Sequence, residues 1–241
     1  MIQDFENYTK EDQQVWTTLF ERQMINLQGK ASQDYLDCLE KMSPVLNANE
    51  IPNFEKVNQW FESSTGWKIE VVPGLIPVED FFKLLSEKKF CSSTWLRTMA
   101  QLDYLEEPDM FHDTFGHIPL LCNPIFSEFA LEFGKVGMEN IEDEQFLLKL
   151  QRLYWFTIEF GLMTTKNGRR IYGAGIISSF GESKSSLSDD VEVKPFDLDK
   201  ILNQEFRTDV PQNLYFEIND LNDLYNAIIK LKQESHAVDN I

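Results

Sequence analysis

The amino-acid sequence predicts a mainly α-helical protein with a few short β-strands, folded as a single domain. Apolar residues recur at helical spacing through most of the 241 residues, whereas only residues 67–72 and 214–218 have the residue types of strands. The composition is that of a globular chain, with 42% hydrophobic and 26% charged residues. A domain of this length buries roughly 70–75% of the surface of its unfolded chain, so it needs no disulfide or structural metal to fold.

Three helices are predicted in the first 65 residues. Thr9 and Asp12 have the spacing of a capping box and begin the first helix. Its apolar positions are Val15, Trp16, Leu19 and Phe20. A second helix, over 35–42, ends near Pro44, and a third begins at Asn53 and ends at Gly66.

The rest of the chain alternates helices with two short strands. In order, we expect a strand over 67–72, a turn at Pro73-Gly74, helices over 78–87, 123–136 and 143–163, a mobile polar loop over 183–190, a helix over 197–204, a strand over 214–218 and a helix from 220. Helices therefore dominate, and the strands form only a small element.

The balance of charges is strongly acidic, with 40 Asp and Glu against 22 Lys and Arg and a net charge of −18. Binding to nucleic acid or to an anionic membrane needs clustered basic residues, so neither is expected as a partner. Cys38, Cys91 and Cys122 are widely spaced, and the first residues lack the basic and apolar regions of a signal peptide. No apolar run comes near the ~20 residues of a membrane span. We therefore expect the protein in a reducing compartment, the cytoplasm.

Two of the three histidines of the chain lie in one apolar stretch, "EPDMFHDTFGHIPLL", residues 107–121. His112 and His117 are predicted on a short helix between two prolines, at 108 and 119. Buried histidines that form hydrogen bonds within a core are common, so the pair alone does not define a binding site.

The spacing of the two histidines is unusual for a pair of metal ligands. Residues five apart diverge by ~140° on an α-helix, in contrast to the ~40° of residues four apart. His112 and His117 could share one face only if Gly116 or Pro119 broke the regular helix.

A third candidate ligand is Glu159, which stands alone in the apolar stretch "YWFTIEFGLM", residues 154–163. A buried carboxylate is costly unless a cation faces it, and the alternative is that its side chain reaches water. Two imidazoles and one carboxylate form the facial triad of non-haem Fe(II) oxygenases, but zinc hydrolases use the same ligand types. The residues themselves therefore indicate a mononuclear metal enzyme and leave its metal open.

Three ordered motifs resemble those of the pterin-dependent aromatic amino acid hydroxylases. They are "HDTFGHIP" (112–119), "YWFTIEFGL" (154–162) and "IYGAGIISSFGE" (171–182), and "LDYLEEPDMFHD" (102–113) is most similar to the bacterial single-domain phenylalanine 4-hydroxylases. The resemblance runs from about residue 66 to 218. It implies a catalytic domain over 66–241, with 1–65 as an N-terminal helical segment packed on it in one compact unit.

The resemblance also implies the chemistry. His112, His117 and Glu159 would bind Fe(II), which together with tetrahydrobiopterin or a related tetrahydropterin activates O2 and hydroxylates L-phenylalanine to L-tyrosine. Arg97 would pair with the carboxylate of the amino acid substrate, as a planar guanidinium does well.

Further residues match the family's substrate and pterin sites. Gly175 and Ser178 would line the substrate pocket, and the substrate ring would lie against Trp155. The stretch "VVPGLIPVEDFF" resembles the pterin loop, in which the backbone of residues 74–76 (Gly74, Leu75 and Ile76) meets the pterin edge and Phe81 stacks on its ring. Asp113 would face the pterin through water, and Asp113 and Trp155 are the residues expected to act in catalysis.

The sequence departs from the family's animal members at three positions. Cys91 replaces a histidine near the substrate, and Pro77 and Val78 replace hydroxyl residues of the pterin loop. The chain also lacks the animal regulatory domain and tetramer helix, so a monomer is expected. Three alternatives stay open: a tryptophan hydroxylase, although Trp155 favours phenylalanine within the family, a metal-dependent hydrolase and a non-catalytic metal-binding protein.

Overall fold

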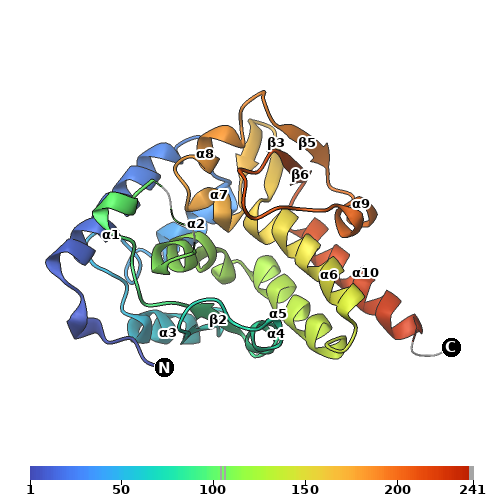
Figure 1. Cartoon of the computed structure of the whole chain (residues 1–241), viewed down its shortest axis with the longest axis horizontal. Helices are drawn as coiled ribbons and strands as arrows, with labels where there is room; N and C mark the ends of the chain where they lie inside the picture. The colour runs from blue at the N-terminus through green and yellow to red at the C-terminus, as the bar shows by residue number, and fades with distance from the viewer. Residues whose placement is uncertain (104, 106, 239–241) are drawn as a thin grey trace.

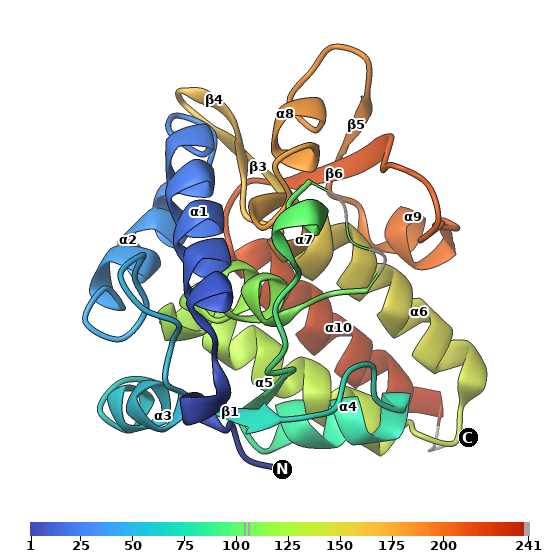
Figure 2. The same ribbon diagram turned by 60° about the vertical axis from the view of Figure 1, so that its left-hand side comes forward.

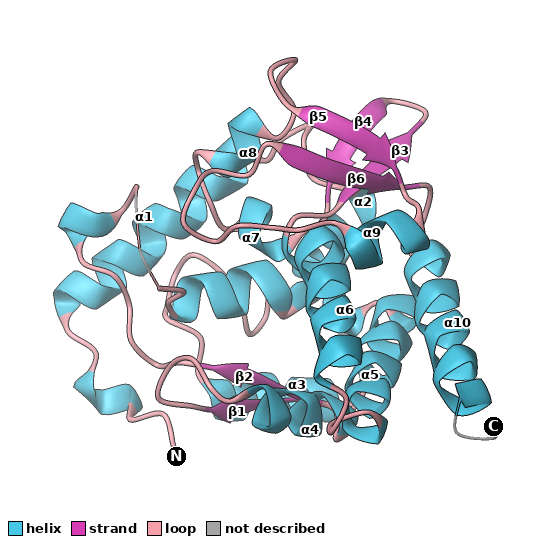
Figure 3. Cartoon of the chain, turned by 45° about the vertical axis from the view of Figure 1, so that its right-hand side comes forward, coloured by secondary structure: helices cyan, strands magenta, loops and turns pink. Residues whose placement is uncertain are grey.

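The computed structural model describes residues 1–103, 105 and 107–238. Tyr104 and Glu106 of the motif over 102–113, and residues 239–241 of the predicted terminal segment, lie outside the described residues. Helices form the body of the molecule, with a four-stranded sheet at one end and a two-stranded sheet at the other (Figure 3). No helix in the described part of the chain is both long and apolar enough to cross a membrane.

The three helices predicted at the N-terminus are present as α1 (Lys10–Asn26), α2 (Gln33–Lys41) and α3 (Phe54–Glu62), after a 3₁₀ turn at Phe5–Asn7. The capping box is confirmed, because Thr9 Oγ1 accepts a hydrogen bond from Asp12 N and Asp12 Oδ2 accepts one from Thr9 N. Asn53 caps α3 as expected. α1 lies along one flank of the molecule, beside α2 (Figure 2).

The larger sheet has the strand order β4-β3-β6-β5. Its strands are β3 (Leu162–Thr165), β4 (Gly168–Ile171), β5 (Glu192–Pro195) and β6 (Leu214–Ile218). β3 and β4 form an antiparallel hairpin, whereas β6 pairs in parallel with both β3 and β5. The segment after α1 joins this sheet, since Ser32 N donates to Ile171 O at 2.7 Å and Ile171 N donates to Lys30 O at 2.8 Å.

The smaller sheet pairs β1 (Lys68–Val71) in parallel with β2 (Lys89–Ser92), and α4 (Val78–Ser86) connects them. α4 packs against α5 (Pro124–Glu139), which also contacts α10 (Asn222–Val238). α6 (Glu144–Tyr154) packs against α9 (Leu198–Asn203), and the short helices α7 (Ala174–Ile177) and α8 (Glu182–Ser185) follow β4 in the chain. In Figure 1, α5, α6 and α10 lie together on one side of the molecule.

The predicted helix over 143–163 is wrong in its second half. α6 ends at Tyr154, residues Trp155–Glu159 form a π-helix, and Leu162 and Met163 belong to β3. Both apolar residues are buried, so their hydrophobic pattern fits a buried strand as well as a helix.

The polar segment over 183–190 is not a mobile loop along its whole length. It begins inside α8, and the side chains of Ser183 in this helix and of Ser186 at its C-cap are both fully buried. Ser183 Oγ donates to Ser179 O at 2.7 Å, and the hydroxyl is also within hydrogen-bond distance of Gln23 and Asn26 of α1. Small hydroxyl side chains are easily taken for a loop signal, but here that of Ser183 joins α8 to α1 through hydrogen bonds.

Candidate active site

His112 and His117 lie on a π-helix, η3 (His112–His117), and not on the regular short helix predicted from the sequence. Hydrogen bonds in a π-helix join residues five apart, so residues with this spacing lie above one another. The i, i+5 spacing is unfavourable for two ligands on an α-helix, but it places both histidines on the same face of this π-helix.

The contacts around η3 explain why the wider helix is stable here. Pro119 has no N–H, so it cannot donate to Phe115 O, four residues earlier. The hydroxyl of Tyr35 in α2 donates to this carbonyl at 2.6 Å. The ring of Phe115 stacks on that of Phe111 with centroids 4.7 Å apart, and Phe111 in turn contacts Trp16 of α1. Side chains of the N-terminal helices therefore support the π-helix that carries the two histidines.

Glu159 ends a second π-helix, over Trp155–Glu159, in which Phe160 N donates to Trp155 O at 2.9 Å. Tyr154 and Glu159 are five residues apart, as the two histidines are, and the nearby Tyr154 hydroxyl helps to lower the pKa of the Glu159 carboxylate. We did not predict a role for Tyr154. Its i, i+5 relation to Glu159 was the signal that could have found it.

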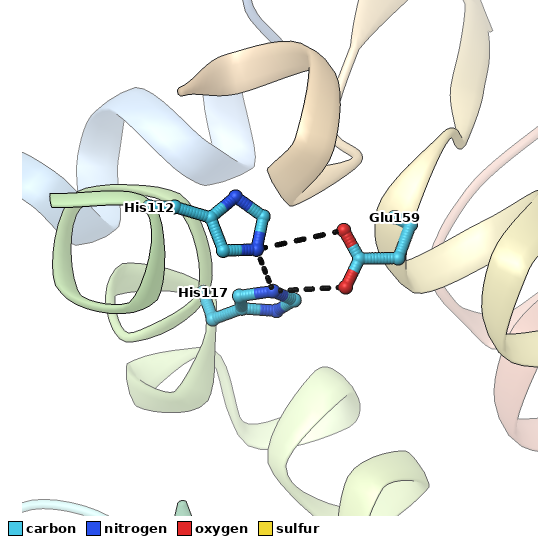
Figure 4. A group of neighbouring side chains, drawn as sticks. All are labelled: His112, His117 and Glu159. Carbon is cyan, nitrogen blue, oxygen red and sulfur yellow. Dashed lines mark hydrogen bonds and ion pairs between the residues drawn. The ribbon is translucent and has the colours of Figure 1, made fainter. Parts of the chain in front are cut away.

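The two π-helices bring the three predicted ligands together (Figure 4). Nε2 of His117 lies 3.1 Å from Nε2 of His112 and 3.1 Å from Oε1 of Glu159, and His112 Nε2 lies 3.8 Å from Glu159 Oε2. Ligands about 2.1 Å from an ion and at right angles are about 3 Å apart. In the described part of the chain, Glu159 forms ion pairs only with these two histidines. The arrangement therefore fits one metal ion.

The protonation states suit a metal as well. Burial opposes the charge of Glu159, but the attraction of His117 and His112 and the neighbouring Tyr154 hydroxyl outweigh it and lower the pKa of Glu159 to about 2. Burial lowers the pKa of His112 to about 4, against the attraction of Glu159. At neutral pH the pair is a carboxylate and a neutral imidazole, which are the forms that coordinate metals.

Ser178 fixes the orientation of the His112 ring. Its hydroxyl lies 2.9 Å from His112 Nδ1 and donates its only proton to Ala174 O at 2.8 Å. It must therefore accept from Nδ1–H, which leaves the lone pair of His112 Nε2 free for a metal. Ser178 thus contacts a candidate ligand directly, where the sequence predicted only a pocket wall.

Gly175 and Gly116 allow α7 to lie close to Glu159 and to η3. A Cβ at Gly175 would lie 3.1 Å from Oε2 of Glu159, and one at Gly116 would lie 2.9 Å from Ala174 O. α7 is therefore in close contact with η3 and with the carboxylate ligand.

A cavity of about 310 Å³ adjoins the three candidate ligands. The residues predicted to contact pterin or substrate and found in its wall are Gly74, Leu75, Ile76, Phe81, Asp113 and Trp155. Its aromatic lining also includes Phe82, Phe90, Phe133, Tyr154 and Phe206. Arg97, Gly175 and Ser178 are not among the described residues that line it.

The polar groups of this wall are few and buried. Burial raises the pKa of Asp113 to about 7, although its Oδ2 accepts a hydrogen bond from Ser93 N at 2.9 Å. Burial also raises the pKa of the Cys91 thiol to about 12, so this group is uncharged at neutral pH. The cavity therefore suits a largely apolar molecule with a few polar edges.

Arg97 is not a free guanidinium. Its Nε and Nη2 lie 2.8 and 2.9 Å from the two carboxylate oxygens of Asp109, which is fully buried. Asp109 also accepts from the backbone N–H of His112 at 3.1 Å, so it links Arg97 to the start of η3. Burial would raise the pKa of Asp109, but Arg97 and the N–H donors lower it.

Trp155 is held by residues from a loop far along the chain. Its ring stacks on Phe206 with centroids 4.8 Å apart and an angle of 20°, and its Nε1 donates to Gln212 Oε1 at 3.1 Å. Phe160 packs on the indole as well, at 4.5 Å. The contacts with Phe206 and Gln212 could not be predicted from the sequence, because they come from a loop without a recognisable motif.

Comparisons with known proteins identify the family of this chain. The sequence profile of the biopterin-dependent aromatic amino acid hydroxylases matches residues 3–238, so the likeness extends well beyond the 66–218 inferred from the motifs. Phenylalanine-4-hydroxylase of Pseudomonas aeruginosa is 43% identical over 92% of this chain and 83% of its own length. That of Chromobacterium violaceum is 44% identical over 93% of this chain and 75% of its own length.

A solved structure is also very similar. The Chromobacterium violaceum phenylalanine hydroxylase with bound iron(III) and the oxidised cofactor 7,8-dihydrobiopterin superposes with a TM-score of 0.91 at 42% identity, over 98% of this chain and 86% of the other. The extent of these matches is far above what a shared fold alone requires. The chain therefore belongs to the biopterin-dependent aromatic amino acid hydroxylases.

Proposed function

We propose that the chain hydroxylates L-phenylalanine to L-tyrosine with O2, a tetrahydropterin and an Fe(II) ion held by His112, His117 and Glu159. The observation that carries the proposal is the meeting of these three ligand atoms, within 4.8 Å of one another, at the wall of a largely apolar cavity. The phenylalanine-4-hydroxylase relatives support the substrate. The relative with iron(III) and 7,8-dihydrobiopterin supports both cofactors.

In the reaction, the residues of this chain would hold the metal and exclude water from the space beside it. When bound, Fe(II) and the tetrahydropterin supply the electrons that activate O2. Three protein ligands on one face of an ion leave its other positions open. The hydrogen bond from His112 Nδ1–H to Ser178 keeps this ligand aimed at the ion, and the nearby Tyr154 hydroxyl helps to keep Glu159 ionised. The aromatic wall excludes water from the space beside them.

The pterin is assigned to the part of the cavity formed by residues 74–81. The backbone of Gly74, Leu75 and Ile76 would meet its polar edge, and the ring of Phe81 would stack on it. Phe81 is fixed for this role by edge-on contact with Tyr154, with ring centroids 5.4 Å apart. The carboxyl group of Asp113, which also lines the cavity, would face the pterin through water.

The aromatic substrate is assigned to the side of Trp155, against which its ring would lie. Gly175, whose lack of a side chain lets α7 lie close to Glu159, and Ser178 would bound this pocket from behind the ligands, since neither is among the described residues that line the cavity. Arg97 would receive the substrate carboxylate with its remaining N–H groups, since Nη1 has only a long contact, 3.4 Å to Leu102 O. Substrate binding would thus extend the Arg97–Asp109 pair and would not compete with it.

Product analysis tests the proposal. The purified chain is loaded with Fe(II) without oxygen, and phenylalanine, tryptophan or tyrosine is then supplied with tetrahydropterin and air. We expect tyrosine from phenylalanine as the main product, and none from Glu159→Ala, whose iron content should fall sharply. Faster hydroxylation of tryptophan than of phenylalanine would contradict the proposal that phenylalanine is the substrate. Full iron content and activity in Glu159→Ala would reject the ligand set.

We also infer a monomer in a reducing, cytoplasmic compartment, with small molecules and no nucleic acid as partners. The three cysteines form no disulfide, and the net charge of −18 repels nucleic acid. Light scattering after size-exclusion chromatography should give a mass near 28.2 kDa. A mass twice as large at micromolar concentration would contradict the monomer.

A further inference from the structure

Gln23 occupies an apolar position of α1. The neighbouring positions of the same helix face are Trp16, Leu19, Phe20 and Leu27, all buried in the core. Gln23 is only 2% exposed, so its amide must find partners inside the protein.

The partners of this amide are backbone carbonyls on both sides of Ser178. Nε2 of Gln23 lies 2.6 Å from Ile177 O and 3.2 Å from Ser179 O. Ile177 is the last residue of α7, where helix carbonyls lack partners within the helix. Gln23 therefore caps α7 from outside and fixes the backbone that carries Ser178.

Two further polar groups hold Gln23 in place. Its Oε1 accepts from Asn26 Nδ2 at 3.4 Å, and its Nε2 lies 3.3 Å from Ser183 Oγ. Ser183 is fully buried and Asn26 is 8% exposed. The amide of Gln23 is thus part of a buried network and has little freedom to turn away from α7.

The network leads to a candidate metal ligand. Ser178, held between the two carbonyls that Gln23 binds, accepts the hydrogen bond from His112 Nδ1–H at 2.9 Å. We propose that Gln23 is a positioning residue that fixes, through Ser178, the tautomer and orientation of His112 for the metal. The inference rests on the proposed function, in that His112 must be a ligand.

This assignment gives the N-terminal segment a part in the site. Gln23 belongs to none of the motifs that identify the family in the sequence, and it does not line the cavity among the described residues. Its effect on the metal is exerted over two hydrogen-bonded steps, from amide to backbone and from hydroxyl to imidazole.

The test compares two glutamines of α1 by anaerobic titration with Fe(II) and, for its absorption spectrum, Co(II). Gln23→Met keeps the length of the side chain and removes its hydrogen bonds. Gln13→Met is the matched control, because Gln13 also binds backbone groups of a distant segment, Asn49 O and Ile51 N, both at 3.1 Å. We expect metal binding about 3–10-fold weaker in Gln23→Met, with an altered Co(II) spectrum, and unchanged in Gln13→Met.

A double variant separates positioning from general loss of structure. Ser178→Ala removes the hydrogen-bond partner of His112 and should weaken metal binding by roughly 10–100-fold. Gln23→Met should add little to it, since both act through one hydrogen bond. Additive losses, equal losses in both glutamine variants, or unchanged metal affinity in Gln23→Met would overturn the inference.

Two outcomes remain distinct from this failure. If the unmodified chain bound neither Fe(II) nor Co(II), the proposed function itself would fail. If Gln23→Met did not fold, Ser183→Ala would replace it, because it removes a smaller part of the same network. It should lower metal affinity in the same direction, and unchanged affinity there would count against the inference.

Discussion

Arg97 has two tasks at the scale of a single residue. Two of its N–H groups hold Asp109, which in turn caps the backbone of His112, and the rest of the guanidinium is proposed to receive the substrate carboxylate. The residue type was predictable from the sequence because a planar fork suits a carboxylate. The pair with Asp109 was not, because the two residues lie in loops whose geometry depends on the whole fold.

Arg97→Lys should therefore raise KM for phenylalanine, because an ammonium group lacks the planar fork that pairs with Asp109 through two N–H groups and leaves others for a substrate. Loss of a charge-assisted contact costs about 1.5–3 kcal/mol, so kcat/KM should fall roughly ten- to hundredfold. Arg169→Lys, which loosens a pair with Glu217 in the large sheet, is the control. Unchanged steady-state kinetics in Arg97→Lys would show that Arg97 does not bind the substrate carboxylate.

Trp155 depends on Gln212 for its orientation, since the indole N–H donates to the side chain of Gln212. Gln212→Leu removes this bond, together with the hydrogen bond of the same side chain to Leu214 O, and keeps the volume. We expect a rise in KM for phenylalanine of about 2–10-fold, the value of one neutral hydrogen bond, and a smaller preference for phenylalanine over tryptophan. Gln204→Leu, in the same loop, should change neither quantity. An unaltered preference in Gln212→Leu would show that stacking on Phe206 is enough.

At the scale of elements, two π-helices build the site. Residue types and their order along the chain predicted the candidate ligands, which the structure brings together, and capping residues predicted the starts of α1 and α3. Helical periodicity could not predict η3 or the π-helix over Trp155–Glu159, because it assumes 3.6 residues in each turn. The wider turns depend on contacts from elsewhere, such as the Tyr35 hydroxyl on Phe115 O.

Gly116→Ala tests the contact between η3 and α7. The new Cβ would lie 2.9 Å from Ala174 O, so one of the two elements must move by a few tenths of an ångström. We expect weaker Fe(II) binding and a stability loss of about 1–3 kcal/mol from overpacking. Gly181→Ala is the control, since a Cβ there has no heavy atom within 4 Å. Equal iron affinity in the two variants, measured by titration, would mean that α7 does not constrain the ligands.

At the scale of the whole molecule, the N-terminal segment and the rest of the chain share one core. Residues 1–65 were expected to pack on the catalytic domain over 66–241, and we propose that the two form a single folding unit. α1 and α2 cover the back of η3, and the segment after α1 pairs with β4. The sequence predicted the helices but could not predict this contact, because pairing of distant segments leaves no local pattern.

Removal of residues 1–65 should consequently abolish cooperative folding. It would expose Phe111 and Phe115, which are fully buried, and each large apolar side chain contributes roughly 1.5–3 kcal/mol when buried. Thermal unfolding followed by circular dichroism should show no sharp transition for 66–241 and a single one for the full chain. A truncated chain that melts cooperatively and binds Fe(II) would contradict the single unit.

The central claim is that this site hydroxylates phenylalanine with electrons from a tetrahydropterin. The most direct measurement is tyrosine formation by the chain loaded with Fe(II), in air, with each cosubstrate omitted in turn. We predict tyrosine only when iron, phenylalanine and tetrahydropterin are all present, with 2-oxoglutarate neither required nor able to replace the pterin. Tyrosine formed at the full rate without the pterin would contradict the account, even with His112, His117 and Glu159 confirmed as ligands.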